Sequence, residues 1–249
     1  MKLKFLGFAL LAVCVCAVCC MCGSDSKTPD YEFPDGSDPD PQPGDYPAGL
    51  TVTEFTDDLG GGKQCLGFVA VADLKANPKL RFNAVHLPQQ KTPSRIHAEF
   101  ASANRGTACV TINAGYWWAR NSLSLLVTGG TVKSIENQTV TRNNQTVYPV
   151  RSSFGQMASG GFETHWIYCV LDDGNKPYAF PSALDNDERT NTYMSAPPTS
   201  KTLGAVLWTP QEAVGGGPML VKEGKNVAVE NYWKEAVSYT HLTLPTNRE

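Results

Sequence analysis

Short apolar runs divide the middle of the chain into predicted strands. Residues 68–74 are apolar except for Asp73, and residues 79–85 alternate apolar and polar side chains after an Asn-Pro turn. A continuous run predicts a buried strand, whereas strict alternation predicts a strand with one exposed face. We therefore expect these two strands to pair as a hairpin.

One amphipathic helix is predicted after this hairpin. Thr92 precedes Pro93, which favours a helix start, and the apolar residues that follow recur at the spacing of one buried helix face. The helix is expected to end near residue 104. Residues 110–112 are then expected to form a buried strand that ends at a polar corner, as strands do where α/β sheets present site residues.

The chain from residue 123 onward is predicted to be rich in strands. Residues 124–127 and 132–135 flank a Gly-Gly turn, and the strand 166–171 ends at Asp172-Asp173-Gly174, a strong turn signal. Residues 181–198 lack periodicity and predict a long surface loop. The fold class predicted from these patterns is α+β, with a mixed β-sheet and flanking helices, incomplete at its C-terminal end.

The first segment, residues 1–22, has the pattern of a lipoprotein signal. Lysines precede an apolar run that is too short to span a bilayer. Cys20 follows the small-residue sequence Ala-Val-Cys, and Cys22 precedes a polar, acidic stretch that resembles the start of Bacteroidetes surface lipoproteins. Both cysteines are candidates for lipidation, which would anchor the protein to a membrane of the cell envelope. A cysteine-rich but ordinary signal peptide is the alternative.

Three further segments follow the signal. Residues 23–49 are rich in proline and aspartate and predict an extended tether. Residues 50–236 are expected to form the folded domain. Residues 237–249 resemble the translation of a sequencing adapter, so we expect them to be non-native, with few contacts to the domain from Tyr239, Leu242 and Leu244. A genuine polar tail is the alternative.

The net charge and the cysteine spacing exclude several classes of partner and of structural site. The formal net charge is −3 and no stripe of lysine or arginine occurs, so nucleic acid is not predicted as a partner. The spacing of Cys65, Cys109 and Cys169 fits neither a disulfide framework nor a zinc site, and we interpret them as small buried residues with one disulfide possible. No metal site and no cofactor are predicted, and metal dependence is left open.

Two glycine-containing motifs carry the candidate chemistry. Three consecutive glycines lie between apolar runs: Gly215, Gly216 and Gly217. Because glycine permits positive φ and close backbone approach, they predict a nest of N–H groups for an anion or a sugar. The upstream corner contains Asn113, Gly115 and Tyr116. The Asn113 amide can bind a ligand oxygen or close its own turn, and the Tyr116 ring can stack on a sugar or pack in the core.

Together these motifs resemble the phosphodiester glycosidase family, which includes the enzyme that uncovers mannose 6-phosphate by removing N-acetylglucosamine. The resemblance covers residues 67–229. It implies hydrolysis of a sugar-1-phosphodiester of the N-acetylglucosamine-1-phosphate type on a phosphorylated glycan. It also implies Asn113 and Arg151 as catalytic residues, with Gly115, Tyr116 and the three glycines binding substrate. This chain has Ala-Gly-Tyr where the family has Gly-Gly-Phe, and it lacks the family's later Asp-Gly-Arg and Asp-Gly-Gly motifs.

Arg151 suits a phosphodiester because its guanidinium offers a fixed fork of donors and keeps its charge. A surface arginine without function is the alternative. The nearby titratable groups are Glu163, His165, Asp172 and Asp173, none of which the sequence assigns as an acid or base. Two other functions stay open, namely a surface lipoprotein that binds glycan without turning it over and a purely structural envelope protein.

Overall fold

The computed structural model describes residues 46–60, 63–86, 93–102, 106–118, 121–136 and 138–235. The predicted signal with Cys20 and Cys22, most of the predicted tether, and the tail with Tyr239, Leu242 and Leu244 lie outside these residues. The chain divides into two compact units, one formed by residues 1–81 and 91–113 and the other by residues 82–90 and 114–249.

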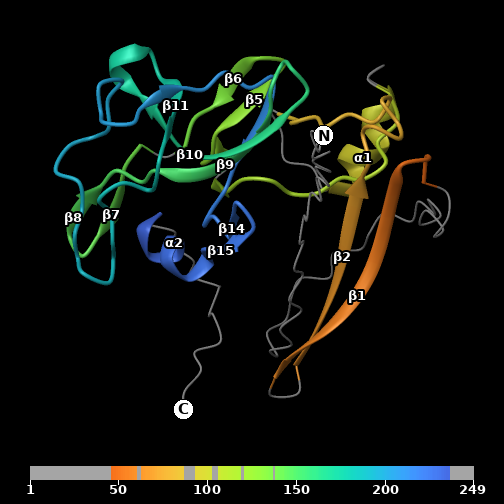
Figure 1. Cartoon of the computed structure of the whole chain (residues 1–249), viewed down its shortest axis with the longest axis horizontal. Helices are drawn as coiled ribbons and strands as arrows, with labels where there is room; N and C mark the ends of the chain where they lie inside the picture. Colours follow the sequence, from red (N-terminus) through yellow and green to blue (C-terminus); the bar gives the residue numbers. More distant parts are fainter. Residues whose placement is uncertain are drawn as a thin grey trace, which may run out of the picture. The chain divides into compact units, whose positions relative to one another are not determined.

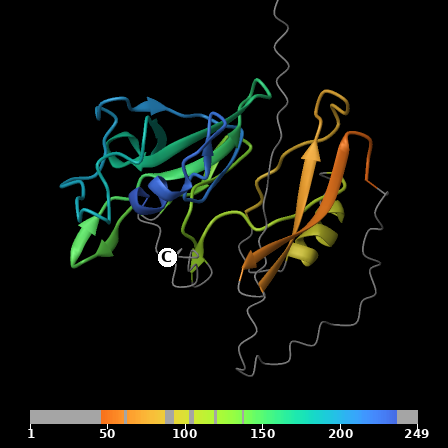
Figure 2. The same ribbon diagram turned by 60° about the horizontal axis from the view of Figure 1, so that its bottom comes forward.

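The first unit contains a long hairpin and a short helix (Figure 2). Strand β1 (Leu50–Gly60) pairs antiparallel with β2 (Lys63–Ala72), and the register runs from Leu50 opposite Ala72 to Gly60 opposite Lys63. Helix α1 (Pro93–Ser102) starts at the proline that the sequence predicts as its first residue. The predicted helix and the strand near residues 68–72 are thus confirmed.

Two other predictions for this unit are wrong. Residues 79–85 form no strand, because β1 provides β2 with a longer, threonine-rich partner along its whole length. Residues 110–112 also form no strand, and Val110 and Ile112 are each 43% exposed. An apolar run of three residues without a neighbouring strand cannot satisfy its backbone hydrogen bonds in a sheet.

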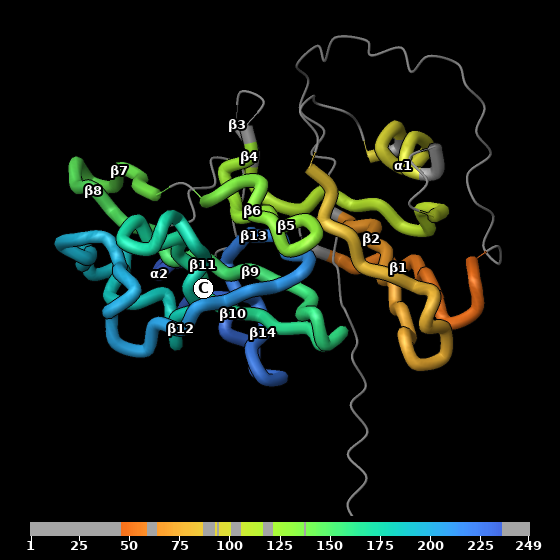
Figure 3. The backbone as a smooth tube through the Cα atoms, turned by 90° about the horizontal axis from the view of Figure 1, so that it is seen from above, coloured from red at the N-terminus to blue at the C-terminus, as the bar shows by residue number. Residues whose placement is uncertain are grey.

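The second unit is built on one curled sheet that resembles half of a barrel (Figures 1 and 3). Its strands lie in the order β12-β11-β10-β9-β13-β5-β6, and every neighbouring pair is antiparallel. The strands are β5 (Leu126–Thr128), β6 (Thr131–Ser134), β9 (Arg151–Gln156), β10 (Phe162–Val170), β11 (Lys176–Phe180), β12 (Val206–Leu207) and β13 (Glu212–Gly215).

The predicted mixed sheet with flanking helices is therefore wrong, and the fold of the described residues is mainly β. The only α-helices among the described residues are α1 and α2 (Ala228–Lys234). Short turns join β5 to β6, β9 to β10 and β10 to β11, and such turns connect antiparallel strands only. Parallel neighbours would need long crossover connections, for which these segments leave no room.

Local turn signals predicted several of these elements well. The hairpin β5–β6, strand β10 and its closing turn η1 (Leu171–Asp173) are all confirmed. The segment 181–198 contains a single bridge, between Asp187 and Thr192, and is otherwise irregular as predicted. The remaining strands form small hairpins: β3 (Trp117–Trp118) with β4 (Asn121–Ser122), β7 (Val140–Arg142) with β8 (Gln145–Val147), and β14 (Val221–Lys222) with β15 (Lys225–Asn226).

The large sheet is buried on both faces because β10 is apolar at successive positions. Ile167 and Cys169 belong to one core cluster, while Trp166, Tyr168 and Val170 belong to the other. Successive side chains of a strand point to opposite faces, so this run supplies both cores. The other buried members are Leu125, Val127, Ala179, Trp208 and Ala213 in the first cluster, and Val150, Phe180, Ala183 and Met219 in the second.

Cys65 and Cys169 are buried, and Cys109 is partly exposed. All three are free thiols. Within the described ranges, no helix is long and apolar enough to cross a membrane.

Candidate functional site

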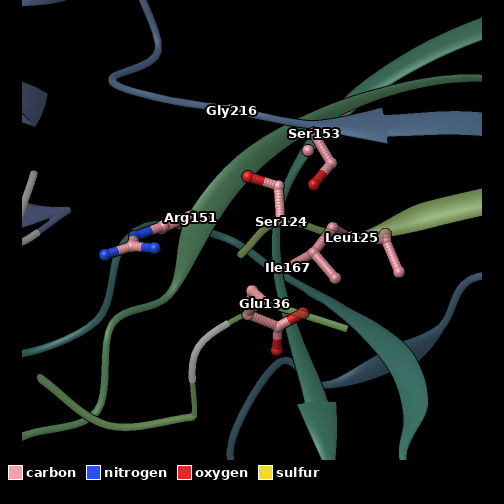
Figure 4. A pocket seen from close by; sticks show the side chains of 8 residues that line it. Ser124, Leu125, Glu136, Arg151, Ser153, Ile167 and Gly216 are labelled. Atoms are coloured by element: carbon pink, nitrogen blue, oxygen red, sulfur yellow. The ribbon is translucent and has the colours of Figure 1, made fainter. Parts of the chain in front are cut away.

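The centre of the large sheet forms a narrow pocket (Figure 4). Arg151 begins β9 opposite Ile167 of β10, and Ser153 lies opposite Gly215 of β13. Side chains two residues apart on a strand point to the same side of the sheet, so β9 directs Arg151 and Ser153 to one side. Its lining side chains pack so closely that no space for a water molecule is left between them. The lining residues are Ser124, Leu125, Glu136, Arg151, Ser153, Ile167, Gly215 and Gly216.

The two motifs singled out in the sequence meet beside this pocket. The backbone N–H of Tyr116 donates to Ser124 Oγ at 2.8 Å, and the Tyr116 hydroxyl donates to the carbonyl of Gly217. Gly115 has no space for a side chain, since a Cβ there would lie 2.8 Å from the carbonyl oxygen of Gly215. The corner at residues 115–116 and the triple glycine are therefore in direct contact.

The expected nest of N–H groups is not formed by Gly215 and Gly216. The Gly215 N–H donates to the Leu125 carbonyl at 2.7 Å, and the Gly216 N–H donates to the Ser152 carbonyl at 2.9 Å. Both donors are thus used between segments of the protein, and neither points at a ligand. Of the three glycines, Gly217 alone has a left-handed φ, at 138°. The nest prediction is corrected because neighbouring segments supply acceptors that the local sequence does not reveal.

Gly215 and Gly216 are expected to respond differently to alanine. A Cβ on Gly215 would lie 2.8 Å from the Leu125 backbone nitrogen, whereas a Cβ on Gly216 would meet nothing within 4 Å. Gly215→Ala should lower the free energy of unfolding by about 1–3 kcal/mol, and Gly216→Ala should change it by less than about 0.5 kcal/mol. Urea unfolding of both variants measures this difference, and equal losses would contradict it.

Arg151 is 8% exposed and lies against an aromatic ring. Its guanidinium carbon is 5.7 Å from the centroid of the Tyr116 ring, within the range of a cation–π contact. Burial lowers the pKa of Arg151, while the nearby carboxyl groups of Glu136 and Glu235 act in the opposite direction. Since arginine keeps its proton in proteins, the pocket holds a positive charge.

Glu136 supplies a buried carboxyl group to the same pocket and is 4% exposed. Its Oε1 accepts hydrogen bonds from the backbone N–H of Cys169 and from Gln138 Nε2. Its Oε2 is also buried and has no hydrogen-bond partner in the part of the chain that the structure describes. Burial is the largest influence on this group and raises the pKa of Glu136.

Glu235 is a second buried acid, fully enclosed at the end of α2. Its Oε2 accepts the Ser152 N–H at 2.8 Å. Its Oε1 accepts the indole N–H of Trp166 at 2.9 Å and the Met219 N–H at 2.8 Å. Burial raises the pKa of Glu235 despite these donors. The carboxyl group thereby ties α2 to the start of β9, next to Arg151.

The sequence did not single out Glu136, Glu235, Ser124 or Ser153. The only local signal for burial of Glu136 is that a lone glutamate follows an apolar residue, Ile135. The same pattern occurs at exposed glutamates, so it does not identify a buried one.

Asn113 is exposed, belongs to the first unit and does not line the pocket. The acids and histidine considered in the sequence have structural partners instead. His165 Nε2 lies 3.1 Å from Glu163 Oε2, which also accepts the Trp208 indole N–H at 2.9 Å. Asp172 accepts hydrogen bonds from Ser200, which lower its pKa, and Asp173 accepts them from Lys176 and Tyr178 with the same effect.

No family model, no curated protein and no solved structure matches this chain. Among the described residues, no group of three or more His, Cys, Asp or Glu side chains is arranged to hold a metal ion. The residues that line the narrow pocket supply one cation, one buried carboxyl group and two hydroxyl groups.

Proposed function

We propose that the protein hydrolyses a sugar-1-phosphodiester of the N-acetylglucosamine-1-phosphate type on a phosphorylated glycan. The observation that supports this most is the buried Arg151, which lines a pocket with Ser124 and Ser153 and lies over the Tyr116 ring. These residues belong to the same cluster as Gly115 and the triple glycine, which the resemblance in the sequence also implicates.

In this proposal Arg151 holds the anion of the diester. A guanidinium offers several N–H donors in one plane and attracts a phosphodiester, which carries one negative charge. The hydroxyl groups of Ser124 and Ser153 are placed to donate to further oxygens of the same group.

The test uses a synthetic N-acetylglucosamine-1-phosphate methyl diester. Release of free N-acetylglucosamine, followed by proton NMR, is the expected result. Saturable binding without release would favour the alternative of a glycan-binding lipoprotein. If the protein neither binds the diester nor releases N-acetylglucosamine, the hydrolase and the glycan-binding functions are both refuted, and a structural role is left. The corresponding sugar-1-phosphate monoester, incubated in parallel, distinguishes diester cleavage from general phosphatase activity.

We also propose that Cys20 or Cys22 carries the lipid that anchors this protein to the cell envelope. Changing both residues to serine should release the protein from the membrane fraction, because no other thiol would then occupy a lipidation position. Fractionation followed by immunoblotting measures the release. Each single variant, run beside the double variant, identifies the cysteine that is used, and a double variant that stays with the membrane would contradict the proposal.

A further inference from the structure

The hairpin β1–β2 (Figure 2) forms a sheet of two strands only. Strand β1 has 11 residues and β2 has 10, yet among the described residues no third strand pairs with the outer edge of either. A two-stranded hairpin on its own is marginally stable in water, whereas a sheet of three or more strands with an apolar face can be stable. A further strand at one of these edges would therefore stabilise the hairpin.

The two faces of the hairpin differ in exposure. On one face Cys65 is 5% exposed, and the ring of Phe55 lies so close to Gly67 that a Cβ there would be 2.4 Å from it. On the other face Leu66 and Phe68 are 48% and 47% exposed. Neighbouring exposed apolar residues are typical of interaction surfaces. The face with Leu66 and Phe68 is thus available for a partner.

The two outer edges of the hairpin differ in charge. Strand β1 carries three exposed acids, Glu54, Asp57 and Asp58. From residue 64 to residue 72, strand β2 has no charged residue and no proline. Charged side chains and prolines are the usual means by which proteins prevent an edge strand from pairing with another chain. The edge of β1 is therefore protected in this way, and the edge of β2 is not.

We propose that the edge of β2 pairs antiparallel with β2 of a second copy of this chain, which gives a four-stranded sheet in the order β1-β2-β2-β1. A twofold axis makes such an interface self-complementary, so both copies use the same surface. The outer edges of this sheet are the acidic β1 strands, and their like charges oppose the addition of a third copy. The charges thus select β2 as the edge that pairs and limit the assembly to two copies. This pairing involves none of the residues that line the Arg151 pocket.

The sequence of β2 also selects the register of this pairing. If Phe68 lies opposite Phe68 of the second copy, the two rings meet on the open face, and Leu66 lies opposite Ala70. Gly67 then lies opposite Val69. An axis shifted by one residue would place Gly67 opposite itself, and glycine inside a strand weakens a sheet. Aromatic pairs directly across two strands stabilise it, so we expect Phe68 on the twofold axis.

Phe68→Cys tests the partner and the register together. Residues directly opposite on antiparallel strands have Cα atoms about 4.5–5.5 Å apart, within the range that a disulfide spans. The full-length variant, oxidised with copper phenanthroline in a cell lysate, should run as a dimer on a non-reducing gel and as a monomer after reduction. Leu220→Cys is the matched control, because Leu220 is 56% exposed but belongs to the second unit. It should give no more dimer than wild type.

A Phe68→Cys variant that forms no more dimer than Leu220→Cys would overturn the proposal. Sedimentation equilibrium of the purified full-length protein, in a density-matched detergent, measures the oligomeric state without a cross-link. Wild type should have twice the mass of one chain. Phe68→Lys should raise the Kd of the dimer by at least about tenfold, since two lysines would face each other across the axis. Leu220→Lys should leave this Kd unchanged.

Lysine at residue 68 should not disturb the fold of a single chain, because Phe68 is half exposed there. Circular dichroism of Phe68→Lys checks this. A monomeric wild type would overturn the proposal whether or not the variant folds, and so would a wild type that forms assemblies larger than two copies. An equal Kd in wild type and a folded Phe68→Lys would show that the copies meet at another surface, which also contradicts it.

Discussion

Glu235→Ala is expected to lower the free energy of unfolding by about 3–5 kcal/mol. Glu235 is fully buried, and its carboxyl group accepts hydrogen bonds from Ser152, Trp166 and Met219. Alanine would leave these three donors without an acceptor in a site that water does not reach. It would also leave a cavity between α2 and β9.

Urea unfolding monitored by tryptophan fluorescence measures this loss. Glu230→Gln is the matched control, because Glu230 lies on the same helix but is exposed and pairs with Lys234. Exposed helix pairs of this spacing contribute about 0.3–0.5 kcal/mol, so this control should change little. If Glu235→Ala were as stable as Glu230→Gln, the three hydrogen bonds would not stabilise the fold.

The wild-type stability should also depend on pH with a definite sign. Burial raises the folded-state pKa of both Glu235 and Glu136 above the unfolded value. The stability that these acids contribute is therefore fully present below the unfolded pKa and is lost as pH rises through the folded pKa. Glu235→Ala should show less of this loss than wild type over the same pH range.

If the protein hydrolyses the diester as proposed, Arg151→Gln should reduce kcat/KM by about a hundredfold or more, because it removes the positive charge that the proposal assigns to binding the anion. Arg151→Lys keeps the charge but loses the planar fork, so we expect an intermediate loss. Arg189→Gln is the control, because Arg189 forms its ion pair with Asp187 and does not line the pocket. Initial rates of N-acetylglucosamine release give these values, and a wild-type rate in Arg151→Gln would remove Arg151 from the site.

The burial of Arg151 means that substitution by alanine would affect folding as well as activity. Its side chain packs on Tyr116 between two buried acids, so truncation to alanine would also open a cavity. Glutamine and lysine preserve more of the volume. Melting temperatures measured for each variant separate lost activity from lost fold.

Sequence reasoning worked best where a turn lies between two adjacent strands. The Gly129-Gly130 turn predicted the strands on both sides of it, and the Asp172-Asp173-Gly174 turn predicted the strand that it closes, because turn geometry is encoded by the residues that form it. It failed where a partner comes from far along the chain. The insertion of β13 between β9 and β5 brings together residues near 126, 154 and 214, and no local pattern specifies that order.

The same limit applies to the candidate site: residues in local motifs were predicted, and residues that depend on distant partners were not. Arg151, Tyr116 and Gly215 were found from motifs, and the structure brings all three together. The two buried acids were missed because burial of a carboxyl group depends on donors elsewhere in the chain, such as Ser152 and Met219 for Glu235. The glycine nest was predicted wrongly because close packing and ligand binding demand the same residue, and only the neighbours decide between them.

The position of β13 has a consequence for how the protein is made. Because this late segment lies between β9 and β5, the hairpin β5–β6 and the meander β9–β12 cannot join until residues 212–215 have left the ribosome. Until then, β5 and β9 each present an unpaired edge of backbone N–H and C=O groups, which can pair with strands of other chains. Joining them also closes long loops, which slows folding. A chain that stalls during synthesis before residue 212 therefore holds two incomplete sheets, each a template for aggregation.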